Sequence, residues 1–162
     1  MSTGWPLAPG SEVAFRATTP GLTGECLRHR DGRAVISPID KNSPISDKQD
    51  ATWIVRAGLA DRSCVSLESR NFPEGYLRHH AGAVYQQQLE ESEQFALDAT
   101  FVVVAGKNGS GVSLASYNYP DRFVRHYAGE VFIAAEGGPE PWASAQSWAD
   151  DVSWLVGPAW ML

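Results

Sequence analysis

The stretch "PEGYLRHHAG", residues 73–82, places two histidines and an arginine inside a segment that otherwise has the composition of a strand. Its tyrosine and leucine favour a strand, while its proline and glycines favour turns on either side. The central tripeptide recurs. "CLRHR" contains His29 and "FVRHY" contains His126, which lie 50 residues before His79 and 47 residues after it. Such spacing indicates an internal repeat of about fifty residues.

Other features keep the same order in each repeat. An alternating strand comes before each tripeptide, reading "VAFRATTP" from Val13, "VSLESRNFP" from Val65 and "VSLASYNYP" from Val112. The tripeptide strand is followed by a short strand such as "AVYQQQ" and a variable loop. A last strand then begins at an aspartate, reading "DATWIVRAG" from Asp50, "DATFVVVAG" from Asp98 and "DVSWLVGP" from Asp151. An aromatic residue follows each aspartate three positions later. We therefore expect three four-stranded lobes, at about residues 10–59, 60–108 and 109–162.

The strands are short, turns are frequent, and no segment has a helical period, so the sequence predicts an all-β protein. Three units are too few for a propeller, which needs about four blades. Three four-stranded units that share one core fit a β-trefoil, and we expect a single β-trefoil domain over residues 1–162. Leu27, Leu77 and Val124, with the aromatics Trp53, Phe101 and Trp154, are the expected core.

Composition excludes several classes of partner. The net charge is −6 and no cluster of Lys and Arg is present, which argues against a nucleic-acid surface. No apolar stretch is long enough to span a membrane. The N-terminal "MSTGWPLAPGSEVAF" lacks the features of a signal peptide, so we expect a cytoplasmic protein, or a secreted one if a leader has been removed. Cys26 and Cys64 have no CxxC partner and are expected as core fillers.

The recurring histidine and aspartate are the candidate functional residues. Alternate strand residues share a face, so Leu77 and His79 are expected on the core side and Arg78 on the outer face. An aspartate before a strand also commonly ties a turn through its own backbone, which is the structural alternative. One donor and one acceptor per lobe suit the hydroxyls of a small polyol. The predicted pairs are His29 with Asp50, His79 with Asp98, and His126 with Asp151, next to Asp150.

The strings "VSLESRNFPEGYLRHH", "FALDATFVVVAG" and "VSLASYNYPDRFVRHY" resemble the AbfB domain of α-L-arabinofuranosidases, also called carbohydrate-binding module family 42. The resemblance covers about residues 11–158. It implies a β-trefoil that binds arabinofuranose side chains, in which the histidine and aspartate of each lobe bind sugar hydroxyls. Those residues are His79 with Asp98, His126 with Asp151, and, less closely matched, His29 with Asp50.

Two lobes depart from the pattern. Lobe one reads "RATTP" where the others have S-x-N-aromatic-P, and it lacks the aromatic that stands three residues before the later aspartates. Its pocket is therefore expected to be the weakest. Lobe three has a longer loop, "EGGPEPWASAQSW", with Trp142 and Trp148 expected near its pocket. These tryptophans form either a stacking lid over a ligand or a hydrophobic plug.

Two functions remain open. The first is binding of an arabinofuranose-type sugar by the lobe pockets. The second is a small cofactor-independent enzyme of secondary metabolism, for dehydration, addition or cyclisation, with His79 and Asp98 or His126 and Asp151 as a general acid–base pair. No metal site is expected, because the three histidines lie in separate lobes. Glycosidase activity is not expected, because the catalytic domain of the related enzymes is a separate one.

Overall fold

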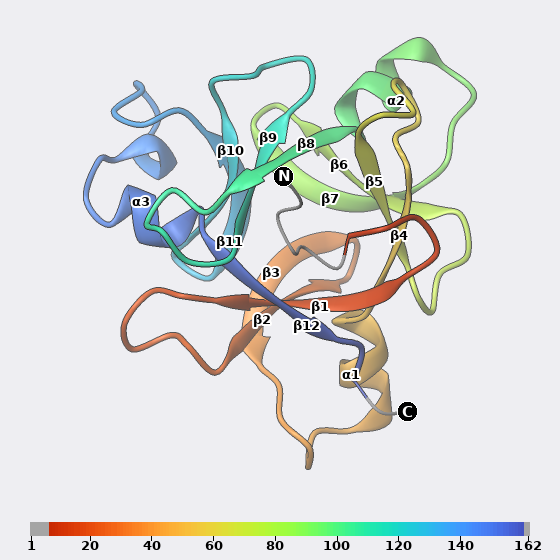
Figure 1. The fold of residues 1–162 in the computed structure, drawn as a ribbon, viewed down its shortest axis with the longest axis horizontal. Coiled ribbons are helices and arrows are strands. Elements are labelled where there is room, and N and C mark those ends of the chain that lie inside the picture. Colours follow the sequence, from red (N-terminus) through yellow and green to blue (C-terminus); the bar gives the residue numbers. More distant parts are fainter. Residues whose placement is uncertain (1–6, 161–162) are drawn as a thin grey trace.

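Twelve strands, four from each repeat, form one hydrogen-bonded sheet in the computed structural model, which describes residues 7–160 (Figure 1). Lobe one contains β1 (Glu12–Ala17), β2 (Glu25–Arg30), β3 (Arg33–Pro38) and β4 (Trp53–Ala57). Lobe two contains β5 (Val65–Ser69), β6 (Gly75–His80), β7 (Ala83–Gln88) and β8 (Phe101–Ala105). Lobe three contains β9 (Val112–Ser116), β10 (Phe123–Tyr127), β11 (Glu130–Ala134) and β12 (Trp154–Pro158).

The first and last strands of the lobes close into a six-stranded barrel. β1 pairs with β12 and β4, β5 pairs with β4 and β8, and β9 pairs with β8 and β12, all antiparallel. The middle strands form three hairpins, β2–β3, β6–β7 and β10–β11. The hairpins also pair with one another, through β3–β7, β7–β11 and β11–β3. A barrel capped by three hairpins is a β-trefoil, so the predicted fold is confirmed.

Each hairpin turns on two residues that both have positive φ. The φ angles are 52° and 79° at Asp31–Gly32, 51° and 85° at Ala81–Gly82, and 53° and 84° at Ala128–Gly129. This pattern belongs to a type I′ turn, whose twist matches that of the flanking strands. The alanines adopt it at a cost, because a Cβ is strained in the left-handed region.

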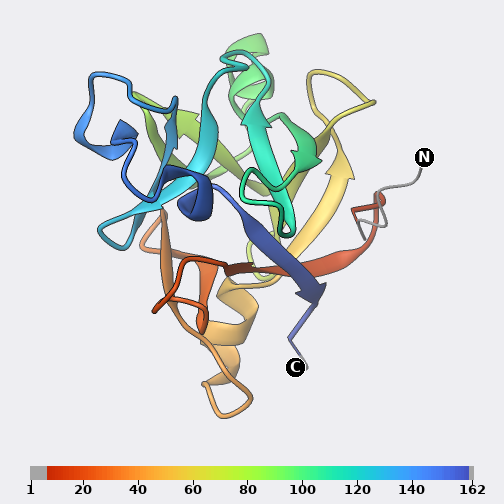
Figure 2. The same ribbon diagram turned by 60° about the vertical axis from the view of Figure 1, so that its left-hand side comes forward.

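Short helices stand in the segments for which the sequence predicts variable loops. They are α1 (Ile45–Asp50), α2 (Glu93–Asp98), α3 (Trp148–Asp151) and the 3₁₀ helix η1 (Pro141–Ala143). Helices of three to six residues are too short to show a 3.6-residue period, which is why the sequence did not reveal them. Each α-helix ends at the repeated aspartate, and the three helices lie at separate places around the molecule (Figures 1 and 2).

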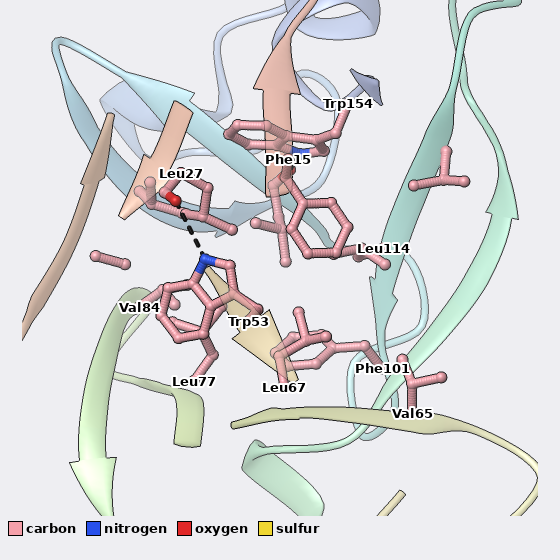
Figure 3. Close-up of a cluster of buried hydrophobic side chains, with 14 of the residues drawn as sticks. Phe15, Leu27, Trp53, Val65, Leu67, Leu77, Val84, Phe101, Leu114 and Trp154 are labelled. Carbon is pink, nitrogen blue, oxygen red and sulfur yellow. Dashed lines mark hydrogen bonds between the residues drawn. The ribbon is translucent and has the colours of Figure 1, made fainter. Parts of the chain in front are cut away.

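The expected core residues are buried at the centre of the barrel (Figure 3). Leu27, Leu77 and Val124 each have 0% of their surface exposed. The indole Nε1 of Trp53 donates to the carbonyl oxygen of Leu27 over 3.1 Å, and Trp154 makes the same bond to Val124. Apolar side chains at equivalent positions of the three lobes thus form one shared core.

The two cysteines are both free, Cys26 buried and Cys64 partly exposed. Cys26 therefore fills the core as expected, whereas Cys64 does not lie in the core. Over residues 7–160, no helix has the length and apolar character needed to cross a membrane.

Candidate functional site

Each lobe brings together an arginine, a histidine and an aspartate. The first two are neighbours on the second strand of the lobe, and the aspartate is the last residue of the following helix. The Nε2 of the histidine lies 3.6 Å from Oδ1 of the aspartate in all three lobes. The structure therefore brings each predicted histidine to its predicted aspartate. We call these groups site one (Arg28, His29, Asp50), site two (Arg78, His79, Asp98) and site three (Arg125, His126, Asp151).

The expectation that the arginine lies on the outer face is wrong. Arg78 is only 8% exposed, and its Nη2 forms an ion pair with Oδ2 of Asp98. Its guanidinium also lies 5.0 Å from the ring of Phe95 on α2. The helix α2, which lies where the sequence predicts a loop, covers that side of the strand. Arg28 and Arg125 make the equivalent ion pairs, at 2.5 and 2.8 Å.

A residue from the following lobe completes each site. In site two, Oδ1 of Asn118 accepts a hydrogen bond from Nε2 of His79 over 2.8 Å, and its Nδ2 donates to Asp98 Oδ1 over 3.0 Å. The hydroxyl of Ser116 lies 3.2 Å from the same Nε2. Asn118 and Ser116 belong to the S-x-N-aromatic-P string at the end of β9. The string of one lobe therefore supplies side chains to the site of the preceding lobe.

Site one has the same arrangement, with residues supplied by lobe two. Asn71 Oδ1 accepts from Nε2 of His29 over 3.0 Å, and Nδ2 donates to Asp50 over 2.8 Å. Ser69 lies 2.9 Å from the imidazole. The ring of Phe72, the aromatic of the string, packs edge-on against His29 at 4.9 Å between centroids.

Site three is completed by lobe one, whose string differs. The hydroxyl of Thr19 donates to Asp151 Oδ1 over 2.7 Å and accepts from His126 Nε2 over 3.1 Å. A hydroxyl is both donor and acceptor, so it makes the two bonds that the asparagine amide makes in the other sites. The serine of the string is replaced by Ala17 and the aromatic by Pro20. In site three, therefore, one side chain still joins the histidine to the aspartate, but the serine and the aromatic ring beside the histidine are absent.

The string of lobe one lies at site three and not at site one, because Thr19 contacts His126 and Asp151. The departure "RATTP" therefore does not weaken site one, and the expectation that the lobe-one pocket is the weakest stays a prediction. Site one contains the complete string of lobe two. The missing aromatic before Asp50 is replaced by Asp47, which forms an ion pair with Arg28 at 3.3 Å. The equivalent position in lobe two, Phe95, packs on Arg78 instead.

The position of Asp151 is also resolved by the structure. Asp151 binds Arg125 and Thr19, whereas the carboxylate of Asp150 accepts from Nδ2 of Asn108 over 2.9 Å. The aspartate that the spacing favoured is therefore the one beside His126.

Burial keeps the three imidazoles neutral. Desolvation lowers the pKa of His29, His79 and His126. It outweighs the hydrogen bonds to Asn71 and Asn118 and the neighbouring carboxylates, all of which raise the pKa. Because Asn oxygens only accept, Nε2 carries the proton in sites one and two. Burial also raises the pKa of Asp98, but hydrogen bonds from Arg78, Asn118 and Gln94 outweigh it and lower the pKa overall. Site two thus combines a neutral donor with a stable carboxylate.

Cavities open onto sites two and three. The cavity at site two has a volume of about 350 Å³. It is lined by His79, His80, Ala81, Gly82, Gln94, Asp98, Tyr119, Arg122, Ile133, Glu140 and Trp142. The cavity at site three measures about 290 Å³ and includes Thr19, His126 and Asp151. A larger cavity of about 560 Å³, against β12, contains none of the site histidines or aspartates. Among residues 7–160, no group of three or more His, Cys, Asp and Glu could hold a metal ion.

The two loop tryptophans have different positions. Trp142 was expected near the pocket of lobe three, but it lines the cavity at site two, because the loop extends toward the neighbouring hairpin. Trp148 is 6% exposed, packs edge-on against Phe123 and donates from its indole to the Ala134 carbonyl over 3.3 Å. Of the lid and plug alternatives, the burial of Trp148 fits the plug.

Comparison with known proteins places this geometry in a family. The model of the "Alpha-L-arabinofuranosidase B (ABFB) domain" matches residues 15–156. The chain belongs to the AbfB family. The resemblance read from the repeated strings is therefore confirmed.

The relatives of this AbfB domain are longer proteins. A probable α-L-arabinofuranosidase B of Aspergillus clavatus is 37% identical over 156 residues, which are 96% of this chain and 31% of the relative. An α-L-arabinofuranosidase of Hypocrea jecorina has the same identity and coverage. The solved structure of an arabinofuranosidase complexed with arabinofuranosyl-α-1,2-xylobiose superposes with a TM-score of 0.93 at 36% identity, over 94% of this chain and 32% of that one. The AbfB domain thus spans about a third of the length of these relatives.

Proposed function

We propose that this AbfB domain binds arabinofuranose-type sugars in its lobe pockets, with the histidine and aspartate of each site contacting sugar hydroxyls. The observation that carries the proposal is that both residues of a predicted pair line a cavity, in lobe two and again in lobe three. The arabinofuranosidase relatives and the arabinofuranosyl ligand of a similar solved structure support this choice of sugar.

The chemistry of site two suits a furanose with several hydroxyls. Asp98 is an acceptor, and the imidazole of His79, whose Nε2–H is donated to Asn118, lies beside it at the cavity wall. Gln94 and Arg122 add donors at the rim, and the ring of Tyr119, which is 45% exposed, adds an apolar surface. Ligand sites of this kind combine a few placed polar groups with apolar walls.

Several weak pockets on one domain would bind a branched polysaccharide by avidity. Sites two and three each have a cavity, and a chain that carries many arabinofuranose branches can occupy both. Linked binding events raise the overall affinity without any new contact.

The enzymatic alternative has no comparable support. In an acid–base pair the imidazole donates a hydrogen bond to the carboxylate that orients it, but in each site the His–Asp distance of 3.6 Å is too long for such a bond. In sites one and two the imidazole is held by an asparagine instead. The carboxylate is committed instead to the arginine. None of the relatives described above is a lyase or a cyclase.

A titration with methyl α-L-arabinofuranoside, whose ring is locked as a furanose, tests the proposal. The amides of Gly82 and Gly129, in equivalent turns beside sites two and three, report each site separately in a ¹H–¹⁵N spectrum. His79→Ala should abolish the saturable shift at Gly82 and leave that at Gly129, and His126→Ala should do the reverse. Arg62→Ala, on an exposed turn, is the control. If no amide shifts saturably at millimolar methyl α-L-arabinofuranoside, the proposal is wrong.

A further inference from the structure

The indole of Trp142 forms part of the site-two cavity, although Trp142 belongs to lobe three. Its ring stacks on Phe132 of β11, with centroids 4.6 Å apart and planes only 7° from parallel. Gly82 fits closely against the indole, since a Cβ at that position would lie 3.1 Å from Cζ2. One cavity therefore contains both the His79–Asp98 pair and a large aromatic surface.

A buried cation holds the loop that carries this indole. Arg125 is 1% exposed, and its guanidinium donates to the carbonyl oxygens of Trp142, Ser144 and Gln146 over 2.8, 2.6 and 2.8 Å. It also forms the ion pair with Asp151. The tryptophan is thus fixed through its backbone by Arg125 and through its ring by Phe132.

The equivalent arginines of the other lobes hold no such loop. Arg28 donates to the hydroxyl of Ser37, and Arg78 donates to the side chain of Gln87. In lobe three, by contrast, Arg125 donates to the backbone of the long loop. A rigid aromatic surface loses little entropy when a ligand binds to it.

We propose that Trp142 is the platform of a second subsite in lobe two, which binds the sugar unit to which a terminal arabinofuranose is attached. This inference rests on the proposed function, because the terminal unit must first occupy His79 and Asp98. Glu140 and Arg122 line the same cavity and can hydrogen-bond the hydroxyls of the second unit. Site two therefore recognises a linked sugar, whereas site three recognises mainly the terminal unit.

Site three supports this difference. Its cavity is the smaller of the two and contains no tryptophan, and its aromatic lining is Tyr127. Ala17 and Pro20 replace the serine and the aromatic that flank site two. The gain in affinity from a second sugar unit is therefore expected at site two.

The test compares two sugars at the same amides. Methyl α-L-arabinofuranoside and arabinofuranosyl-α-1,2-xylobiose, which share the locked furanose ring, are titrated separately, and the dissociation constants are read at Gly82 and at Gly129. A stacked aromatic contact predicts about 3- to 10-fold tighter binding of the longer sugar at Gly82. Trp142→Ala should remove this gain and leave the dissociation constant of methyl α-L-arabinofuranoside at Gly82 within about twofold. Trp160→Ala, which alters a tryptophan of the separate cavity against β12, should keep the gain.

The possible outcomes separate the two proposals. Equal affinity for both sugars at Gly82, or a gain that survives Trp142→Ala, overturns the subsite and leaves the proposed function standing. No saturable shift with either sugar overturns both. If Trp142→Ala does not fold, Trp142→Phe decides, because a smaller ring should reduce the gain by at least about half, and an undiminished gain contradicts the subsite.

Discussion

The side chain of Asn118 in lobe three bridges His79 and Asp98 in lobe two, accepting from the imidazole over 2.8 Å and donating to the carboxylate over 3.0 Å. Each site of this trefoil is therefore shared between two lobes. A substitution in one lobe should change binding in the lobe before it, and around the ring this makes lobe one act on lobe three.

Thr19→Val should weaken sugar binding at site three, even though Thr19 belongs to lobe one. The change removes the hydroxyl that donates to Asp151 and accepts from His126, and it keeps the volume of the side chain nearly constant. We expect about tenfold weaker binding at the Gly129 amide and a loss of about 1–2 kcal/mol in the free energy of unfolding. Binding at Gly32 or Gly82 should not change. Thr23→Val, at an exposed turn, is the matched control, and a loss confined to Gly32 contradicts the shared site.

The free energy of unfolding should fall as the pH falls below about 6.5. Burial lowers the pKa of His29, His79 and His126 from their ordinary value of 6.5. The unfolded chain then binds protons at a higher pH than the folded chain, so the stability from these neutral histidines is complete above 6.5 and is lost below it. Urea unfolding at pH 7.5, 6.5 and 5.5 measures the effect. An unfolding free energy that is constant or larger at pH 5.5 contradicts it.

Ala81→Gly and Ala128→Gly should each stabilise the protein. Both alanines have φ near 50°, where glycine avoids the strain of a Cβ. The gain should be about 1 kcal/mol, and thermal or urea unfolding measures it. Ala105→Gly, on an exposed position of β8, should instead destabilise by about 0.5–1 kcal/mol. If all three substitutions destabilise equally, the turn assignment is wrong.

Arg78→Met should be strongly destabilising. It leaves the carboxylate of Asp98, which is 4% exposed, without its cationic partner. The expected loss is about 3–5 kcal/mol, since a buried charge without its partner is costly. Arg62→Met, at an exposed turn, should stay within about 0.5 kcal/mol. A loss below about 1 kcal/mol for Arg78→Met would show that water reaches Asp98.

The fold was predictable because the repeats carry it. Leu27, Leu77 and Val124 mark equivalent core positions, and three copies of one four-stranded unit leave few architectures open. The His–Asp pairs were predictable for the same reason, since both residues recur in register. The short helices were not, because four to six residues show no period.

The sharing of sites between lobes was not predictable from strand patterns. A sequence repeat groups Ser116 and Asn118 with His126, but the barrel places them beside His79. The buried role of Arg78 was missed because strand alternation predicts a face and not what covers that face. The sequence does contain a signal of this buried role, because an arginine stands before the histidine in all three repeats. A position that only faces solvent does not need the same residue in every repeat.

If a furanose binds at sites shared between lobes, the loss of Asn118 from lobe three should abolish binding at site two and leave site three intact. Arabinofuranosyl-α-1,2-xylobiose is added to the wild-type domain and to Asn118→Ala, and the Gly82 and Gly129 amides are followed. We predict saturable shifts at both amides in the wild type, with the Gly82 response lost and the Gly129 response kept in the variant. A Gly82 response that is absent in the wild type, or unchanged in Asn118→Ala, would contradict the account.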